Sequence, residues 1–325
     1  MVTSEDLMVR FLQETGVQGS HPPDRYLWTD AYAVCNLLGL YESTQNKQYL
    51  NSALRLISQV HEILGKYHPD DPRTGWLGSG DHPTINGLRI GKTQTERPEK
   101  EKLKQSKEWD RDGQYFHYNM RWIHSLIRTY RVTQQPIYLM YATDLAHAST
   151  KFCHGNSIYW KMSTDLSYPL VRYMGKHDPL DGYLTFSQLL QIQETPTILD
   201  FQSKFREMIS SIDLETTDPL GLGGLMCDLF RMRLMNLNGS LSNEIRAGIR
   251  WGIDHVSITH DLAFRELGLA IGIAALDESD LTRELVAVRE QINKYWQTKS
   301  NFTEHRQINT VMLATSLKPT GFLKL

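Results

Sequence analysis

Two segments of the chain repeat one pattern. Residues 41–53 read YESTQNKQYLNSA, and residues 130–142 read YRVTQQPIYLMYA. Both copies carry Tyr, Thr-Gln, Tyr-Leu and Ala at the same internal positions, and apolar residues at helical spacing precede and follow each of them. Each copy is therefore predicted to be a turn between two helices, which makes the helical hairpin the repeated unit of the chain.

Less exact copies of the hairpin continue downstream. Their predicted first helices recur at roughly 40 residues, a spacing found in helical-hairpin repeats, and lie near 181–193, 220–235, 262–276 and 305–316. The predicted partner helices lie near 198–212, 242–257 and 279–297. No segment alternates between apolar and polar residues with period two, so we predict an all-α chain.

The hairpin count leaves one helix without a partner at each end, Ser4–Glu14 and 305–316. A lone helix must bury its apolar side, so we expect these two to pair, complete a sixth hairpin and close an (α/α)6 toroid. An open solenoid is the competing arrangement and needs polar caps at both ends. We favour the toroid, as a single domain over residues 1–325.

This pattern resembles the six-hairpin glycosidase-like superfamily, whose (α/α)6 toroids include unsaturated glucuronyl hydrolases, other glycosidases and N-acylglucosamine 2-epimerases. The resemblance covers nearly the whole chain as a hairpin count and rests on architecture more than on a diagnostic motif. It implies a fold and a site in the funnel where the connections reach the inner helices. It does not imply one reaction, because one fold hosts many functions.

Composition excludes several classes of protein. Of 325 residues, 35 are Lys or Arg and 37 are Asp or Glu, so no sequence-wide basic field exists to collect nucleic acid or anionic membrane. No apolar run approaches the roughly 20 residues of a membrane helix. The first residues lack the features of a signal peptide, so we expect a cytoplasmic protein.

A long connection at about 68–107 separates the first two hairpins. Its first half is rich in Gly and Pro, whereas its second half, from Glu96 to Glu108, mixes Lys and Glu and is expected to be solvated. Loops of this length inside a compact domain are commonly functional. A lid over the funnel and a plain surface excursion are the two interpretations.

The strongest local cluster follows the connection directly. Acids in the first turn of a helix are ordinary capping chemistry, which accounts for one of them but not for the whole set. Aromatic rings bind the apolar faces of sugars, and carboxylates accept hydrogen bonds from their hydroxyls. We therefore predict a ligand site built from Trp109, Asp110, Arg111, Asp112, Tyr115 and His117.

A second cluster, Lys176-His177-Asp178-Pro179-Leu180-Asp181, begins the third inner helix. Pro179 suits the first helical position, so Asp178 is predicted to be the N-cap and Asp181 to lie near the third position. Asp181 is either a capping residue or a carboxylate that points into the funnel. Some unsaturated glucuronyl hydrolases carry a similar His-Asp before a glycine, although the spacing from His177-Asp178 to the next glycine differs here.

Other predicted inner-helix starts contribute single polar or aromatic residues. Each one alone is explained by a cap or by a satisfied core position, but together they would make a polar funnel. These residues are Trp28, Asp30, Arg265, Glu266 and His305. Trp160 is interpreted either as a platform for a ligand or as a surface residue. No zinc-binding spacing, phosphate loop or nucleophile elbow is present, so no metal or cofactor is expected.

These residues favour a carbohydrate-active enzyme that hydrolyses a small or uronate-type glycoside. In that interpretation Asp112 is the acid and Asp181 activates water or stabilises positive charge. Arg111, Lys176 or Arg265 would hold a carboxylate of the substrate.

Three alternatives remain open. A sugar epimerase or isomerase would move a proton with His117, His177 or His305. A terpenoid cyclase would use an acidic motif that Asp110-Arg111-Asp112-Gly113 matches only in part. A non-catalytic binding module would use the concave face for a protein partner. The sequence sets no oligomeric state.

Overall fold

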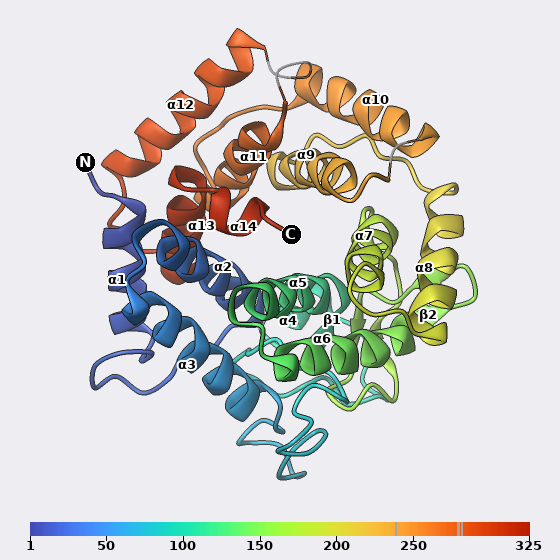
Figure 1. The fold of residues 1–325 in the computed structure, drawn as a ribbon. Helices are drawn as coiled ribbons and strands as arrows, with labels where there is room; N and C mark the ends of the chain where they lie inside the picture. The colour runs from blue at the N-terminus through green and yellow to red at the C-terminus, as the bar shows by residue number, and fades with distance from the viewer. Residues whose placement is uncertain (238, 278–279, 281) are drawn as a thin grey trace. The chain divides into compact units, whose positions relative to one another are not determined.

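The computed structural model describes residues 1–237, 239–277, 280 and 282–325, and within these ranges the chain is mostly helical (Figure 1). It divides into two compact units. Unit 1 contains residues 1–22, 35–50 and 212–325, and unit 2 contains residues 23–34 and 51–211. Whether the chain behaves as one domain stays a prediction. No helix among the described residues combines the length and the apolar character needed to cross a membrane.

The repeated pattern forms the same turn twice. It joins α2 (Leu27–Thr44) to α3 (Lys47–Leu64), and α5 (Phe116–Thr133) to α6 (Pro136–Ser149). Gln45 and Gln134 both have φ of 57°, and the amide N–H of each donates to a tyrosine carbonyl four residues earlier at 2.7 Å. Glutamine adopts this left-handed conformation at a cost, which the helix-ending hydrogen bond offsets. The predicted helical hairpins are confirmed here.

Unit 2 packs its helices in neighbouring pairs. Helix α5 packs against α6 and also against α7 (Asp178–Leu190), which in turn packs against α8 (Pro196–Ile209) (Figure 1). Pro196 begins α8 after the N-cap Thr195, whose side chain accepts from the Ile198 amide N–H at 3.3 Å. The apolar faces of these helices make the core of the unit, and the contact between α5 and α7 brings their first turns together.

Short strands, which the sequence did not predict, lie between the helices of unit 2. An antiparallel sheet of order β1-β4-β5 is formed by β1 (Gln114–Tyr115), β4 (Lys161–Met162) and β5 (Pro169–Val171). Strands β2 (Cys153–His154) and β3 (Ser157–Ile158) form a separate hairpin after the 3-10 helix η1 (Thr150–Phe152). Strands of two or three residues are too short to show an alternating pattern in sequence.

Unit 1 contains the remaining helices. They are α1 (Ser4–Glu14), α9 (Pro219–Leu234), α10 (Ser240–His255), α11 (Ala263–Ala275), α12 (Arg283–Thr298), α13 (Arg306–Leu317) and α14 (Thr320–Leu323). Helix α11 packs against α9, α12 and α13, and α1 packs against α13. Arg306 of α13 forms an ion pair with Glu14 of α1. The predicted pairing of the first and last long helices is thereby confirmed.

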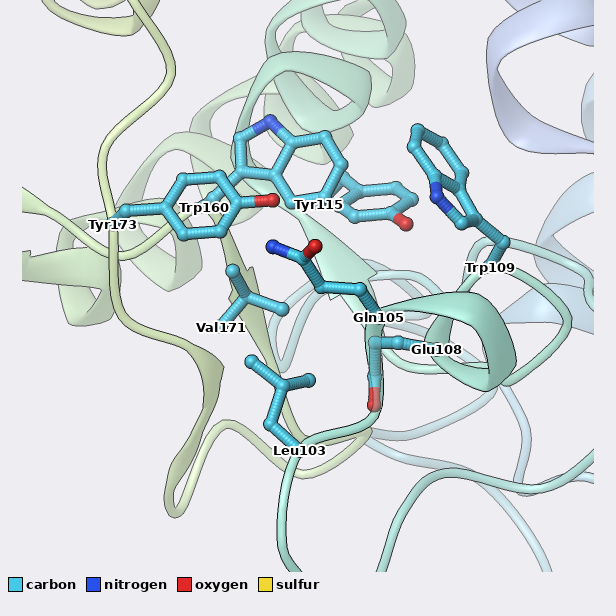
Figure 2. A pocket seen from close by; sticks show the side chains of 8 residues that line it. All are labelled: Leu103, Gln105, Glu108, Trp109, Tyr115, Trp160, Val171 and Tyr173. Atoms are coloured by element: carbon cyan, nitrogen blue, oxygen red, sulfur yellow. The ribbon is translucent and has the colours of Figure 1, made fainter.

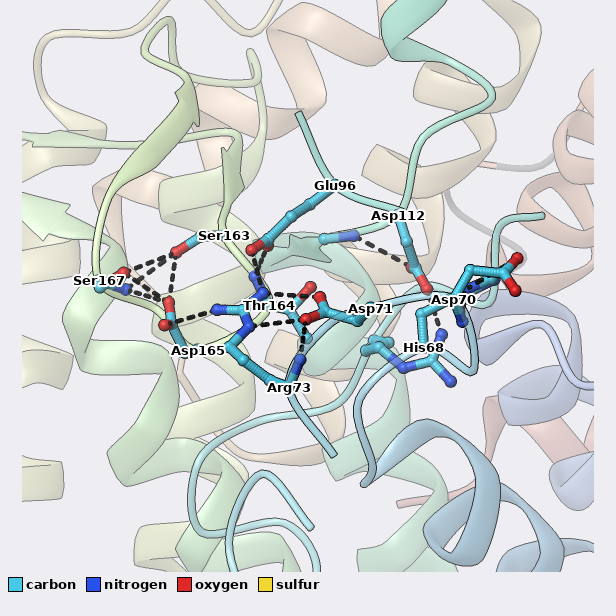
Figure 3. A network of polar contacts seen from close by, with 12 residues as sticks. His68, Asp70, Asp71, Arg73, Glu96, Asp112, Ser163, Thr164, Asp165 and Ser167 are labelled. Carbon is cyan, nitrogen blue, oxygen red and sulfur yellow. Dashed lines mark hydrogen bonds and ion pairs between the residues drawn. The ribbon is translucent and has the colours of Figure 1, made fainter. Parts of the chain in front are cut away.

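The long connection contains one regular element, the single-turn helix α4 (Gln105–Glu108). Arg73 joins the long connection to the segment before β5. The Arg73 guanidinium binds Asp71 at 2.8 Å and Glu96 within the connection, and it binds Asp165 before β5 at 2.9 Å (Figure 3). The prediction that Glu96 to Glu108 is solvated was wrong at both of its ends. Glu96 and Glu108 are buried, because each is paired with arginine or lysine.

A close contact between two backbones in unit 1 generates a stability prediction. A Cβ atom at Gly39 of α2 would lie 2.6 Å from the Cα of Gly321 in α14. Gly39→Ala should therefore lower the free energy of unfolding by about 1–3 kcal/mol through overpacking. Urea unfolding followed by circular dichroism measures this change.

The matched control is Gly224→Ala in α9, where no atom lies within 4 Å of the added Cβ. It should raise stability by about 0.5–1 kcal/mol, because alanine is the better helix former. If both variants behave alike, the contact between Gly39 and Gly321 does not limit the packing.

Candidate active site

Two helix starts in unit 2 bring four ionisable side chains together. Strand β1 runs directly into α5, which carries His117 in its first turn and Arg121 one turn later on the same face. Helix α7 carries Asp178 at its first position and Asp181 three residues further on. Because α5 packs against α7, the two pairs face each other.

Each of the two residues on α5 lies beside one aspartate of α7. The Nδ1 atom of His117 lies 3.8 Å from Oδ1 of Asp178, and Nη2 of Arg121 lies 3.0 Å from Oδ1 of Asp181. Both aspartate side chains are less than a tenth exposed, whereas a quarter of the His117 side chain is exposed. His117 is therefore the member of the group that solvent reaches most easily.

Burial sets the proton affinities of this group. It raises the pKa of Asp178 from 3.8 to about 7, and the nearby negative charge of Asp181 acts in the same direction, while the Gly175 amide N–H opposes it. Burial also lowers the pKa of His117 from 6.5 to about 4. Near neutral pH the site thus contains a half-protonated carboxyl group beside a neutral imidazole.

An aromatic wall lies next to His117. In the small sheet, Tyr115 at the end of β1 pairs with Lys161 of β4. Trp160, the residue before Lys161, is therefore close to Tyr115, and their ring centroids lie 4.7 Å apart. The Trp160 ring is stacked with the rings of Tyr173, at 5.5 Å and 22°, and of His117, at 5.9 Å and 20°. The wall and the ionisable group are therefore continuous through His117.

The wall bounds a hollow of about 160 Å³ (Figure 2). Tyr115, Trp160 and Tyr173 line it together with Leu103, Gln105, Glu108, Trp109 and Val171. In Figure 2 the rings of Tyr173 and Trp109 stand on opposite sides, and the Gln105 amide reaches into the space below Trp160. All of these residues belong to unit 2.

Trp28 and Asp30 lie in the first turn of α2, and Tyr118 connects them to the aromatic wall, because its ring lies 4.9 Å from that of Tyr115 and 4.8 Å from that of His117. The Trp28 ring lies 6.5 Å from the ring of Tyr118, whose hydroxyl is hydrogen-bonded to that of Tyr26 at 2.6 Å. Asp30 is buried, accepts from the Tyr26 amide N–H at 3.0 Å and lies 3.5 Å from Arg25. Burial raises the pKa of Asp30 to about 6, although Arg25 opposes the rise.

Asp112, predicted to be the acid, occupies a different environment. Its side chain is fully buried in an ion pair with Arg89 and accepts from the amide N–H groups of Gly91 at 3.1 Å and Gly113 at 3.0 Å. A carboxylate with these partners holds the long connection against β1. The geometry favours a structural role for Asp112.

The other residues of the two predicted clusters lie in different environments. Trp109 lines the hollow, whereas Asp110 is exposed and Arg111 binds Glu101 at 2.9 Å. Lys176 is exposed, and His177 rather than Asp178 is the N-cap of α7, which corrects the predicted boundary by one residue. Asp178 instead accepts from the Gly175 amide N–H at 2.8 Å, just before the helix.

Arg265, Glu266 and His305 lie in unit 1. Arg265 forms an ion pair with Asp218. Glu266 is buried and accepts four hydrogen bonds: from the amide N–H groups of Thr259 and His260, from His260 Nδ1 and from Trp296 Nε1. His305 begins α13 with φ of 48° and lines a separate hollow of about 400 Å³.

Sequence reasoning missed Arg121 and Tyr173. Arg121 was detectable, because it follows His117 by four residues and therefore shares its helix face. Tyr173 was not detectable, because strand pairing places it beside Trp160. Within the described residues, no group of three or more His, Cys, Asp or Glu side chains is arranged to hold a metal ion.

Comparisons with known proteins identify the fold. No protein-family model and no curated protein matches the sequence. The structure is similar to a family 76 α-mannanase from Bacteroides thetaiotaomicron, at 10% identity and a TM-score of 0.67 over 98% of this chain and 94% of that one.

Two further solved structures are similar over most of their length. One is an inactive variant of a family 76 α-1,6-mannanase from Salegentibacter sp. HEL1_6 in complex with α-1,6-mannotetrose, at 11% identity and a TM-score of 0.62, covering 99% of this chain and 98% of that one. The other is cellobiose 2-epimerase from Bacillus thermoamylovorans B4167, at 10% identity and a TM-score of 0.57, covering 90% and 87%. The chain has the six-hairpin, (α/α)6 fold of these carbohydrate-active enzymes.

Proposed function

We propose that the protein is a carbohydrate-active enzyme that hydrolyses a glycosidic bond with Asp178 as the acid. The proposal rests on one observation: Asp178 is a buried carboxyl group with a raised pKa beside the partly exposed imidazole of His117, next to the Asp181–Arg121 ion pair. Two carboxyl groups in different environments are the usual requirement for glycoside hydrolysis.

Three of the four ionisable side chains would have separate roles in hydrolysis. Asp178 would donate its proton to the leaving oxygen, and the Asp181 carboxylate would stabilise the positive charge that develops on the sugar ring or would orient water. Arg121 would fix the direction of Asp181 through their 3.0 Å contact. The rings of Tyr115 and Trp160 would bind the apolar faces of the sugar.

The Salegentibacter variant suggests where this chain departs from the mannanases. That enzyme is inactive when two consecutive aspartates are replaced by alanine. The only consecutive aspartates in this sequence are Asp70 and Asp71, in the long connection, where Asp71 binds Arg73. The carboxyl pair of our proposal is instead separated by three positions on α7, so we do not extend the α-1,6-mannan substrate to this chain.

A specific observation favours sugar epimerisation as the second candidate. Nδ1 of His117 is buried and has no hydrogen-bond partner among the described residues. Its pKa of about 4 keeps the imidazole neutral and able to accept a proton near pH 7. His117 would then move a proton beside a carbonyl carbon of an opened sugar.

Asp178→Asn is the direct test of hydrolysis. The amide has the same shape but donates no proton, so kcat should fall at least about 100-fold, with the far-ultraviolet circular dichroism unchanged. Release of reducing ends from manno- and cello-oligosaccharides measures the rate. Asp200→Asn, at an exposed position on α8, is the matched control and should keep wild-type activity. Wild-type turnover by Asp178→Asn would refute the assignment of the acid.

The raised pKa of Asp178 predicts a pH dependence. The acid is protonated below about pH 7, so kcat/KM should decline above pH 7, approaching tenfold per pH unit. The folded state also holds this proton more tightly than the unfolded state. Asp178 therefore lowers the free energy of unfolding as the pH rises from about 4 to about 7. The Asp178→Asn variant should lack the part of this decline that comes from Asp178. If the free energy of unfolding of the variant depends on pH as that of the wild type does, the prediction is wrong.

Solvent exchange separates the two candidate reactions. In deuterium oxide, an epimerase would place carbon-bound deuterium in recovered sugar without cleaving a glycosidic bond, and His117→Gln would abolish the incorporation. A hydrolase would release reducing ends and leave the carbon-bound hydrogens of the sugar unchanged. Nuclear magnetic resonance of the recovered sugars records both outcomes.

A further inference from the structure

We propose that the hollow between Trp109, Trp160 and Tyr173 is a second sugar subsite that takes one uncharged pyranose ring of an oligosaccharide. This inference rests on the proposed function, because it extends the same site by one ring. It identifies the substrate as a neutral glycan of at least two rings, and it assigns the long connection a part in binding it.

The first support is an exposed apolar cluster. Leu103, Trp109 and Tyr173 are 41%, 56% and 52% exposed, although each is a large apolar or aromatic residue. All three line the same hollow, and they come from two segments far apart in the sequence. Exposed apolar groups that gather in one concave place mark a binding surface more often than scattered ones do.

The rings are arranged to hold a flat ligand. Trp160 and Tyr173 are stacked with planes 22° apart, whereas the Trp109 ring stands at 80° to that of Trp160, with centroids 5.7 Å apart. A pyranose can thus stack one face on the first pair and present an edge to Trp109. A hollow of about 160 Å³ is below the roughly 300–1,000 Å³ of pockets for larger ligands, and this suits a single ring.

The charges around the hollow favour a neutral ring. Glu108 lines it, and no described lining residue is a lysine, an arginine or a histidine. The buried Lys161 ammonium beneath the wall makes three hydrogen bonds, to Glu108 Oε1 at 2.8 Å and to the carbonyls of Glu108 and Arg111 at 3.0 and 2.8 Å. It has no further proton to offer, so a uronate carboxylate here would face Glu108 without a cationic partner.

The hollow is near enough to the acid for one glycan to occupy both. The Trp160 ring that lines it is stacked on the His117 ring at 5.9 Å, and His117 Nδ1 lies 3.8 Å from the Asp178 carboxyl group. A ring stacked on Trp160 therefore neighbours the residues that act on the bond. Gln105 is the polar group of the hollow placed to hydrogen-bond sugar hydroxyls.

The subsite is built before a ligand arrives. The Trp160 amide N–H donates to the Tyr173 carbonyl at 3.1 Å, and the Trp160 carbonyl accepts from the Phe116 amide N–H at 3.4 Å. Trp160 is thus held between the segment that follows β5 and the start of α5. Such preorganisation reduces the ordering that binding must overcome.

Binding to the Asp178→Asn protein tests the subsite without cleavage. The probes are mannose, α-1,6-mannotetraose, glucose, cellotetraose and tetragalacturonic acid, titrated by calorimetry. We expect at least one neutral tetrasaccharide to bind at least tenfold more tightly than its monosaccharide and than tetragalacturonic acid. Adding Trp109→Ala should remove that tenfold advantage, whereas Trp109→Phe should keep most of it.

Leu199→Ala on α8, which removes a side chain that is 45% exposed, is the matched control and should leave all affinities unchanged. Three results would each overturn the subsite: Trp109→Ala leaves the affinity for every probe unchanged, tetragalacturonic acid binds more tightly than the neutral tetrasaccharides, or no neutral oligosaccharide shows saturable binding. Failure of the proposed function shows separately, as wild-type turnover by Asp178→Asn. Neutral-glycan binding that depends on Trp109 would stand even in that case.

Discussion

The site depends on the hydrogen bonds of one buried charge, the ammonium group of Lys161. It is fully enclosed, and its three hydrogen bonds all reach the segment between Glu108 and Arg111. Glu108 is held from the other side by Arg97 at 3.1 Å. Burying a charge is costly unless every proton finds an acceptor, and here every proton does. This cluster fixes the end of the long connection to β4, and it thereby sets the positions of Trp109, Tyr115 and Trp160 relative to one another.

The helical plan was readable from sequence because its signals are local. Thr-Gln at 44–45 and at 133–134 produces the same left-handed turn because the residues that cap and end each helix are neighbours in the chain. The same is true of the start of α8, where Thr195 and Pro196 identify the boundary. The pairing of α1 with α13 was also predictable, because each has an apolar side that must be covered.

The site was only partly readable, because partners far apart in sequence decide what each carboxyl group does. Asp112 and Asp178 have similar sequence contexts, because each lies close to the start of a predicted inner helix. Arg89 forms an ion pair with Asp112, whereas burial and the charge of Asp181 raise the pKa of Asp178. The strands that bring Tyr173 beside Trp160 are equally non-local, and so is the Arg73 network that joins two loops.

The proposed acid and the aromatic wall are carried by different parts of unit 2. Asp178 and His117 sit on packed helices, while Trp109 is carried by a stretch with a single helical turn. Insertions and deletions are tolerated far better in such stretches than in packed helices. If Asp178 acts as proposed, changes at Leu103, Gln105 and Trp109 that retain Glu108 would exchange one glycan for another and leave the proton-transfer residues untouched.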